Sequence, residues 1–248
     1  MPQPNPIAFT IFNMDIMWYG IIITCGMVIA AVIVYLRAPR HNLSGDNMLT
    51  LTIIVVPAGV IGARAYYVLF NWDIYKGDIA HILNFRGGGL AIHGGLILGI
   101  IAGLIVCLVM KQHPLNVMDL CAPALALAQA IGRWGNYFNS EAHGGLTDLP
   151  WGVVIDGHTY PPTFLYESIW CFILFFILLY VDNHRKFQGQ VLLLYGILYS
   201  AERVMVESLR TDSLMIGPFK QAQVISLVII IVCVIFYVIL RKKQIRRS

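Results

Sequence analysis

Residues 222–240 read AQVISLVIIIVCVIFYVIL and contain no charged side chain in 19 positions. This length matches the ~20 mostly apolar residues that a helix needs to cross the hydrocarbon core of a lipid bilayer. The stretch therefore predicts a transmembrane helix near the end of the chain, and it decides the class of fold to which the rest of the sequence must belong.

Six further apolar segments precede it, so the sequence predicts about seven transmembrane helices. The seven segments cover residues 17–36, 49–70, 90–110, 117–131, 163–181, 191–206 and 222–240. The fourth and the sixth are short and carry polar residues, which predicts that they pack inside the bundle and do not face lipid. The first has no Lys or Arg before it, unlike a cleaved signal peptide, and is expected to be a retained helix.

The composition of the 248 residues agrees with a membrane protein. Hydrophobic residues make up 58% and charged residues 12% of the chain, whereas about a quarter of a soluble domain is charged. Mean hydropathy is +0.73. These values exclude a water-soluble enzyme, a disordered chain and a nucleic-acid-binding protein. We expect an all-α polytopic membrane protein that forms a single domain over residues 1–248, without an internal repeat.

Basic residues in the short connections predict the orientation of the chain, because cytoplasmic loops of membrane proteins are enriched in Lys and Arg. Ten of the 17 basic residues place the N-terminus outside and the C-terminus in the cytoplasm. These ten are Arg37, Arg40, Lys111, Arg185, Lys186, Arg241, Lys242, Lys243, Arg246 and Arg247. The other seven break the pattern and are therefore candidates for a function. They are Arg64, Lys76, Arg86, Arg133, Arg203, Arg210 and Lys220.

The longest outer connection spans about residues 133–162. Within it, residues 151–156 favour a β-strand, and Asp156 and Gly157 form a typical hairpin-turn pair. We therefore expect a small extracellular hairpin above the membrane.

The sequence has no signature of a metal or nucleotide site. Its five cysteines lie in or beside apolar runs without the spacing of metal ligands. The zinc-protease, serine-hydrolase and phosphate-loop signatures are missing as well. We expect no metal ion and no organic cofactor.

The sixth segment and the residues directly after it contain a dense group of charged and polar side chains. Tyr199, Arg203 and Glu207 are spaced four residues apart and Arg210 follows after three, so all four are expected to share one face of a helix. Charged residues inside a membrane usually face a polar cavity or each other. This face is therefore either an internal ion-pair ladder or a cationic wall for an anionic group, in which two arginines outnumber one carboxylate. Glu202, on an adjacent face, weakens that surplus.

A second candidate is the stretch GRWGNYFNSE at residues 132–141. Arg133 offers a planar fork of donors that suits a phosphate group, and Asn136 and Glu141 add polar groups at a membrane boundary. The alternative is a helix end in which Trp134 and Tyr137 act only as interfacial anchors.

Three further positions complete the set of candidates. His93 follows a glycine-rich stretch and suits either a general base or a hydrogen-bonded residue in a tight turn. Tyr19 lies at the outer end of the first segment, where an aromatic belt is the alternative. Glu167 enters the fifth segment one turn after two prolines and is suited to pair with Arg64 or another buried arginine.

Taken in order, these segments resemble the bacterial prolipoprotein diacylglyceryl transferase family. The decisive match is GRWGNYFNSE at 132–141. Supporting matches are WYG at 18–20, GARAYYV at 62–68, HGGL at 93–96, PTFLYE at 162–167 and the run from Arg203 through Glu207 to Arg210. The resemblance covers nearly the whole chain. One departure is Pro161, which stands where many members have histidine.

The resemblance implies an activity and a set of site residues. The family moves the diacylglyceryl group of phosphatidylglycerol onto the lipobox cysteine that follows the signal peptide of a prolipoprotein, and glycerol-1-phosphate leaves. It works in the bacterial cytoplasmic membrane, with the active site toward the outer leaflet. The resemblance implies catalytic roles for Tyr19, His93 and Arg203. It implies substrate binding by Arg133, Asn136, Glu141, Gly144, Tyr199, Glu207 and Arg210.

The chemistry of this reaction suggests individual roles. We expect Arg133 to anchor the lipid phosphate and Arg203 to stabilise the departing phosphate, with Glu207 and Arg210 fixing the Arg203 side chain. A cysteine thiol has an unperturbed pKa of ~8.5, so its deprotonation needs only modest help, from His93 or from the arginines. The competing hypotheses are a transporter or flippase of an anionic lipid or solute and a structural membrane subunit.

Overall fold

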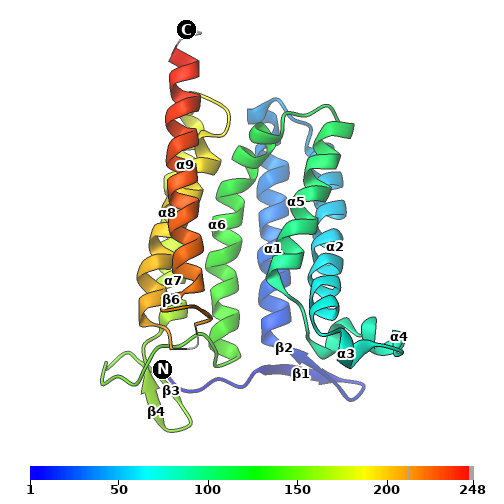
Figure 1. The fold of residues 1–248 in the computed structure, drawn as a ribbon, viewed down its shortest axis with the longest axis vertical. Helices are drawn as coiled ribbons and strands as arrows, with labels where there is room; N and C mark the ends of the chain where they lie inside the picture. The colour runs from blue at the N-terminus through cyan, green and yellow to red at the C-terminus, as the bar shows by residue number, and fades with distance from the viewer. Residues whose placement is uncertain (212, 246–248) are drawn as a thin grey trace. The chain divides into compact units, whose positions relative to one another are not determined.

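Seven long helices dominate the computed structural model, which describes residues 1–211 and 213–245 (Figure 1). They are α1 (Trp18–Arg37), α2 (Gly45–Phe70), α5 (Ile92–Val109), α6 (Pro114–Phe138), α7 (Thr163–Asn183), α8 (Gln190–Leu209) and α9 (Gln221–Ile245). Each coincides with one of the predicted apolar segments, which confirms the all-α polytopic class. Arg246 and Arg247, predicted to lie on the cytoplasmic side, are outside the described residues.

The seven helices differ in hydropathy and in burial. Within the described part of the chain, six are long and apolar enough to cross a membrane, and α8 is not among them. The polar residues Tyr199, Glu202, Arg203 and Glu207 all lie on α8. In the most apolar 18-residue stretch of α6, half of the residues are buried, whereas in the corresponding stretch of α9 only 6% are. The predicted interior position of the fourth segment is therefore confirmed, whereas a seventh crossing and the orientation of the termini stay predictions.

The chain divides into two compact units, Met1–Val34 with Met118–Ser248, and Tyr35–Val117. The second unit contains α2 and α5 together with the short helices η1 (Ala38–His41), α3 (Trp72–Tyr75), α4 (Ile79–Ile82) and η2 (Phe85–Gly87). The expectation of a single domain stays a prediction.

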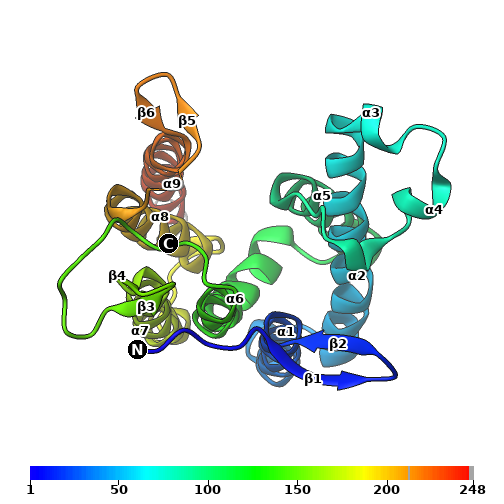
Figure 2. The ribbon, with the colours of Figure 1, turned by 90° about the horizontal axis from the view of Figure 1, so that it is seen from below.

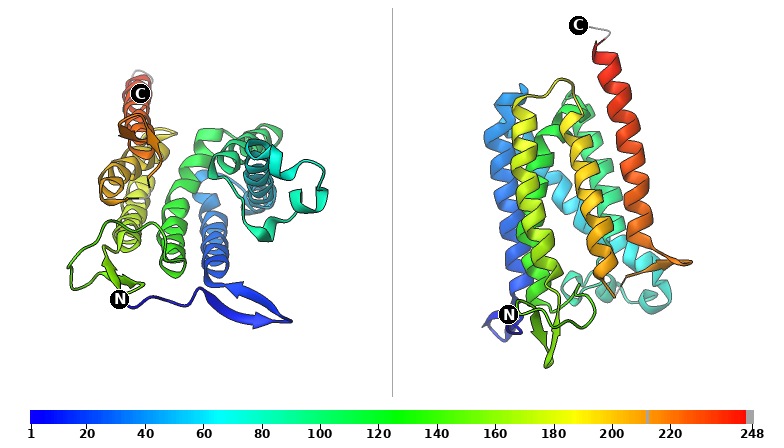
Figure 3. Two further views of the ribbon diagram at one scale, coloured as in Figure 1. Left: turned by 60° about the horizontal axis from the view of Figure 1, so that its bottom comes forward. Right: turned by 90° about the vertical axis from the view of Figure 1, so that its left-hand side faces the viewer.

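In the first unit, small residues and short polar contacts join neighbouring helices. α1 approaches α6 at Gly26, where an added Cβ would lie 3.3 Å from the carbonyl oxygen of Ala128. Ser168 Oγ of α7 donates to the carbonyl oxygen of Ala130 in α6 at 2.7 Å. α8 packs against both α7 and α9 (Figure 3). One cluster of fully buried residues in the core of this unit contains Ala122, Ala126, Leu174, Leu178 and Val191.

Three antiparallel hairpins belong to the first unit: β1 (Ile7–Ile11) with β2 (Met14–Met17), β3 (Val153–Ile155) with β4 (His158–Tyr160), and β5 (Met215–Ile216) with β6 (Phe219–Lys220). The predicted hairpin is β3–β4. Its turn residues Asp156 and Gly157 have φ angles of 50° and 79°, as a tight two-residue turn requires. The other two hairpins were not predicted, because Asn13 and Gly217 stand in turns without the Asn-Gly or Asp-Gly signal. All three lie at the same end of this unit (Figure 1).

In the second unit, α2 and α5 cross at glycines and lie side by side (Figure 2). A Cβ added to Gly62 would lie 2.5 Å from the carbonyl oxygen of Gly94 and 2.6 Å from Cβ of Leu98. Small residues let membrane helices approach this closely. The glycine after His93 therefore serves helix packing, and His93 lies in the first turn of α5, not in a tight turn.

Candidate functional site

Five side chains from three helices of the first unit form what we call the arginine cluster: Arg133, Glu167, Tyr199, Arg203 and Glu207. Glu167 joins the two arginines, with Oε2 2.8 Å from Nη1 of Arg133 and Oε1 accepting from Nη1 of Arg203. Glu207 Oε2 lies 2.5 Å from Nη2 of Arg203. Arg133 Nη2 donates to the Tyr199 hydroxyl at 3.1 Å.

Helix geometry explains how these residues meet. Tyr199, Arg203 and Glu207 follow each other at one-turn spacing on α8, and the Arg203–Glu207 pair confirms that they share a face. α7 supplies Glu167 from its second turn, and α6 supplies Arg133 near its end. Glu167 is 1% exposed, and the arginine side chains are 17% and 14% exposed. Water therefore screens these charges little, and each pair interacts strongly.

The cluster has no surplus of positive charge, which corrects the expected cationic wall. Glu167 enters from α7 and matches Arg133 and Arg203 with two carboxylates, itself and Glu207. Glu202 is also buried on α8 and interacts electrostatically with Glu167 and both arginines. The expected surplus counted the residues of one helix, and the packing of α7 against α8 supplied the missing carboxylate.

Arg210 does not continue the face of α8, although the spacing predicts that it does. The helix ends at Leu209, and Arg210 is extended, with φ −78° and ψ 144°. It forms an isolated antiparallel bridge with Gly144, from the connection after α6. The structure thus pairs two predicted site residues that are far apart in the sequence.

Gly144 is required for this bridge because there is no room for a side chain. A Cβ at Gly144 would lie 2.6 Å from the carbonyl oxygen of Leu209 and 3.3 Å from Cγ of Pro161. We expect Gly144→Ala to lower the free energy of unfolding by about 1–3 kcal/mol, as overpacking does, measured by thermal unfolding in detergent.

The neighbouring glycine provides a matched control for that substitution. A Cβ at Gly145 would lie 3.7 Å from Cγ2 of Thr211, which is an ordinary contact. Gly145→Ala should therefore unfold at the wild-type temperature. Equal stability of both variants would contradict the close approach at Gly144.

The chain at the end of α6 turns back, so that Glu141 is hydrogen-bonded to residues of the last helical turn. Glu141 Oε1 accepts from Nδ2 of Asn136 at 2.9 Å and from Nδ2 of Asn139 at 3.3 Å. The Glu141 amide donates to the Asn136 carbonyl oxygen at 3.1 Å. The polar residues of 132–141 are therefore held by one another, and the exposed carboxylate of Glu141 fixes both amide side chains.

Tyr19 packs on the same end of α6. A Cβ at Gly135 would lie 2.7 Å from the Tyr19 ring, and the adjacent Trp18 stacks on Phe138 with ring centroids 5.3 Å apart. Glu141 and Arg133 are the charged groups that act most on the Tyr19 hydroxyl. The aromatic residues at the start of α1 therefore pack against the end of α6, beyond the role of an aromatic belt.

His93 is the one predicted site residue that lies in the second unit. Its exposed side chain is in the first turn of α5, and its ring lies 6.1 Å from that of Tyr66, measured between centroids. The other nine predicted site residues belong to the first unit. They are Tyr19, Arg133, Asn136, Glu141, Gly144, Tyr199, Arg203, Glu207 and Arg210.

Arg64 holds the segment that leads to His93. Its guanidinium donates to four carbonyl oxygens, those of His81 (2.6 Å), Ile82 (2.9 Å), Gly88 (2.8 Å) and Gly89 (3.2 Å). Arg64 is 4% exposed. Backbone carbonyl oxygens thus accept the hydrogen bonds of Arg64, and Glu167 is not its partner. Glu167 pairs with other buried arginines, which was the second of the two predicted alternatives for Glu167.

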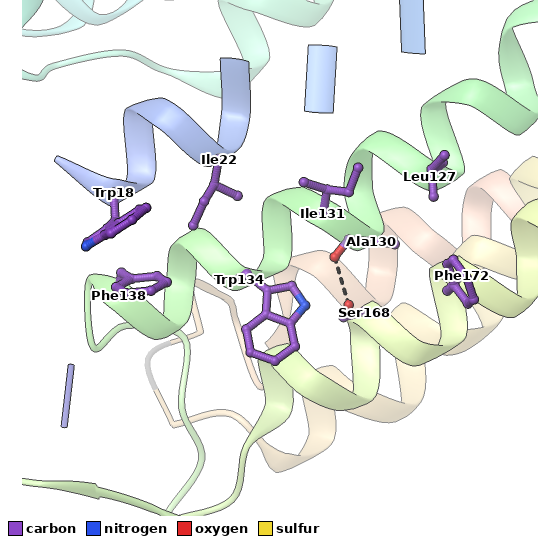
Figure 4. A pocket seen from close by; sticks show the side chains of 9 residues that line it. All are labelled: Trp18, Ile22, Leu127, Ala130, Ile131, Trp134, Phe138, Ser168 and Phe172. Atoms are coloured by element: carbon purple, nitrogen blue, oxygen red, sulfur yellow. Dashed lines mark hydrogen bonds between the residues drawn. The ribbon is translucent and has the colours of Figure 1, made fainter. Parts of the chain in front are cut away.

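An apolar groove of about 570 Å³ lies against α6 and α7 (Figure 4). Its walls come from α1, α6 and α7, and they include Trp18, Ile131, Trp134 and Phe172. Arg133 lies in the α6 turn between two of these residues. The groove suits a long apolar chain, and the arginine cluster suits a charged group.

Glu167 pairs with buried arginines as predicted, but the sequence did not show which arginines these are. Its carboxylate contacts both Arg133 and Arg203, which come from two other helices. The feature of the sequence that pointed to Glu167 is an ionisable side chain inside an apolar segment. Such side chains are rare in membrane helices and are usually paired.

Comparisons with known proteins identify the family. The sequence model of the prolipoprotein diacylglyceryl transferase family matches residues 6–239. The chain is 52% identical over 238 residues to a phosphatidylglycerol–prolipoprotein diacylglyceryl transferase of Clostridioides difficile, with 96% of each chain covered. Proteins of the same name are 47% identical in Finegoldia magna, with 98% of each chain covered, and 46% identical in Clostridium novyi, with 94% and 95% covered. The chain belongs to the prolipoprotein diacylglyceryl transferase family.

Proposed function

We propose that this membrane enzyme transfers the diacylglyceryl group of phosphatidylglycerol to the lipobox cysteine of a prolipoprotein, the first step of lipoprotein maturation. A sulfur–carbon bond forms, the bond from the glycerol carbon to the phosphate oxygen breaks, and glycerol-1-phosphate leaves. The observation that carries this proposal is family membership over nearly the full chain. The arginine cluster and the apolar groove support the proposal.

The two arginines of the cluster are suited to a phosphate. A guanidinium has five N–H donors. The contacts with Glu167 and Tyr199 engage one donor on each Nη of Arg133, and those with Glu167 and Glu207 do the same for Arg203. The remaining donors can bind phosphate oxygens while the carboxylates keep the side chains oriented. Arg133 would anchor the lipid phosphate, and Arg203 would stabilise the charge that develops on the departing phosphate.

The groove fits the apolar part of the same substrate. An acyl chain in the groove would lie along Trp134 and Phe172, and Arg133, which would hold the headgroup, directly precedes Trp134 on α6. The lipid would reach the site laterally from the bilayer. Asn136 at the end of α6, and Tyr19 of α1, which packs against that end, would orient headgroup oxygens.

The nucleophile is the thiol of the prolipoprotein cysteine. Its proton must be accepted as sulfur attacks the glycerol carbon, and His93 remains the proposed base, with the field of the arginines as the alternative. The signal peptide of the prolipoprotein would bind from the bilayer together with its cysteine.

The reaction would take place at the outer side of the bacterial cytoplasmic membrane. Arg133 and Glu207 lie near the ends of their helices that lead to the hairpins. Within the first unit, fewer basic residues flank this end than the opposite end, where Arg185, Lys186 and Lys242 lie. This charge difference supports placing the cluster toward the outer leaflet.

A transfer assay tests the proposal. Purified protein would be mixed with phosphatidylglycerol and a peptide that carries a lipobox with a free cysteine. We expect mass spectrometry to find one diacylglyceryl unit on that cysteine and none on the matched Cys→Ser peptide. Free glycerol-1-phosphate should appear in equal amount.

The competing function is a transporter or flippase of an anionic lipid. It also requires buried arginines, but it does not account for membership in a transferase family. Folded protein that forms no product with several anionic lipids and peptides would contradict the transferase, and lipid flux in vesicles would then identify the carrier.

A further inference from the structure

Lys220 is one of the seven basic residues that break the orientation pattern, and the proposed reaction does not use it. Among the other six, Arg133 and Arg203 belong to the cluster, Arg64 binds carbonyl oxygens, and Lys76 pairs at the surface with Asp73 at 3.3 Å. Lys220 instead lies at the last position of the β5–β6 hairpin, directly before α9.

The ammonium group of Lys220 binds the C-terminal end of α8. Its Nζ donates to the carbonyl oxygens of Glu207 (2.7 Å), Ser208 (3.3 Å) and Arg210 (2.5 Å). The last carbonyls of a helix have no partner within the helix, and the helix dipole makes this end negative. A cation at this position therefore satisfies both requirements.

The hairpin fixes where the ammonium group lies. Lys220 pairs with Met215 across the two strands, and the Gln221 amide donates to the Leu214 carbonyl oxygen at 2.8 Å. Because the backbone on both sides of Lys220 is hydrogen-bonded, the side chain starts from a defined point and reaches back to α8.

We propose that Lys220 is a positioning residue, which holds the last turn of α8 so that Glu207 keeps Arg203 in place. Glu207 carries both ends of this link: its carbonyl oxygen binds Lys220, and its carboxylate binds Arg203. Lys220 also binds the carbonyl oxygen of Arg210, the residue that bridges to Gly144. The inference rests on the proposed transferase function for its effect on catalysis, but not for its effect on α8.

The opposite end of α8 offers a comparison. There Asp119 of α6 accepts from the amides of Gly189 (2.7 Å) and Leu192 (2.9 Å), and Arg185 lies 3.5 Å from its carboxylate. α8 is thus held by an acidic group at its N-terminal end and by a basic group at its C-terminal end, as the helix dipole favours. The two contacts are far apart on the helix, and only the Lys220 contact is next to the cluster.

The test compares Lys220→Met with Lys220→Arg in the full-length protein in detergent. Methionine keeps the length of the side chain and removes its donors, whereas arginine keeps donors and charge. We expect Lys220→Met to lower kcat by roughly 10- to 100-fold, because small misplacement of a catalytic group has effects of this size. KM for the lipid should change less, and Lys220→Arg should recover most of the rate.

Hydrogen exchange supplies a readout that does not depend on activity. Amides of Glu207, Ser208 and Leu209 should exchange faster in Lys220→Met than in the wild type, while those at the N-terminal end of α8 stay unchanged. Lys76→Met is the control for loss of a lysine and should match the wild type in both measurements. If Lys220→Met does not fold, Lys220→Gln takes its place.

The outcomes separate the two proposals. Unchanged exchange at the end of α8 would overturn the role of Lys220, whatever the activity. Faster exchange with unchanged kcat would also overturn it, because the contact would then be structural only. A wild-type protein that transfers nothing would instead contradict the proposed function, and the exchange data would still decide whether Lys220 holds the helix.

Discussion

Replacement of Arg203 by methionine is expected to abolish measurable diacylglyceryl transfer. The substitution removes the donors that we assign to the departing phosphate, and loss of one such donor lowers kcat by ~10²–10³-fold. It also removes one of the two arginines of the cluster that pair with Glu167, so that Arg133 remains. Glu207 loses its arginine partner in the cluster. The measurement is single-turnover transfer to the lipobox peptide, at saturating lipid.

Two further variants separate chemistry from folding. Arg185→Met removes a partly buried arginine of the same unit, which pairs with Asp119 at the other end of α8, and it should retain transfer even if it lowers stability. Arg203→Lys keeps one charge but loses the fork that reaches Glu167 and Glu207 together, so intermediate activity is expected. Full activity of Arg203→Met would refute the assigned role.

Glu167→Gln is expected to have the largest effect on stability. The carboxylate is 1% exposed and is shared by two arginines, and breaking a buried ion pair costs about 3–5 kcal/mol because a charge is left uncompensated. Glutamine keeps the shape, but it replaces one acceptor oxygen with an NH2 group, which faces a guanidinium. Thermal and denaturant unfolding in detergent would measure the loss, and transfer should fall with it.

Substitutions of two other carboxylates give a scale for the loss of stability in Glu167→Gln. Glu207→Gln removes a partner from Arg203 alone, so a smaller loss of stability is expected. Asp73→Asn removes a surface carboxylate that is 95% exposed and pairs with Lys76, and exposed pairs contribute about 0–1 kcal/mol. If Glu167→Gln proves no more destabilising than Asp73→Asn, Glu167 is not the residue that organises the cluster.

Local sequence features were sufficient for the helices and for one hairpin. The hydrophobicity of a segment depends on its own residues, so the seven apolar segments coincide with the seven long helices. The Asp156–Gly157 turn was predictable for the same reason, because its backbone conformation is set by two residues. The i, i+4 spacing likewise placed Tyr199, Arg203 and Glu207 on one face.

The partners of the charged residues depended on contacts between helices. The spacing along α8 predicted an excess of arginine, but α7 brings Glu167 to both Arg133 and Arg203. Arg210 leaves the helical face because α8 ends one residue before it and the chain pairs with Gly144. Neither change has a signal within the segment itself.

The amino-acid sequence was sufficient to predict a polytopic helical membrane protein and to propose the residues that its chemistry would use. Only the tertiary structure decided which acid balances which base, and that Lys220 from a hairpin binds the end of α8. The physical reason is the range of the interactions: hydrophobicity and turn preference act within a few residues, whereas an ion pair forms only between groups that packing has already brought within about 4 Å.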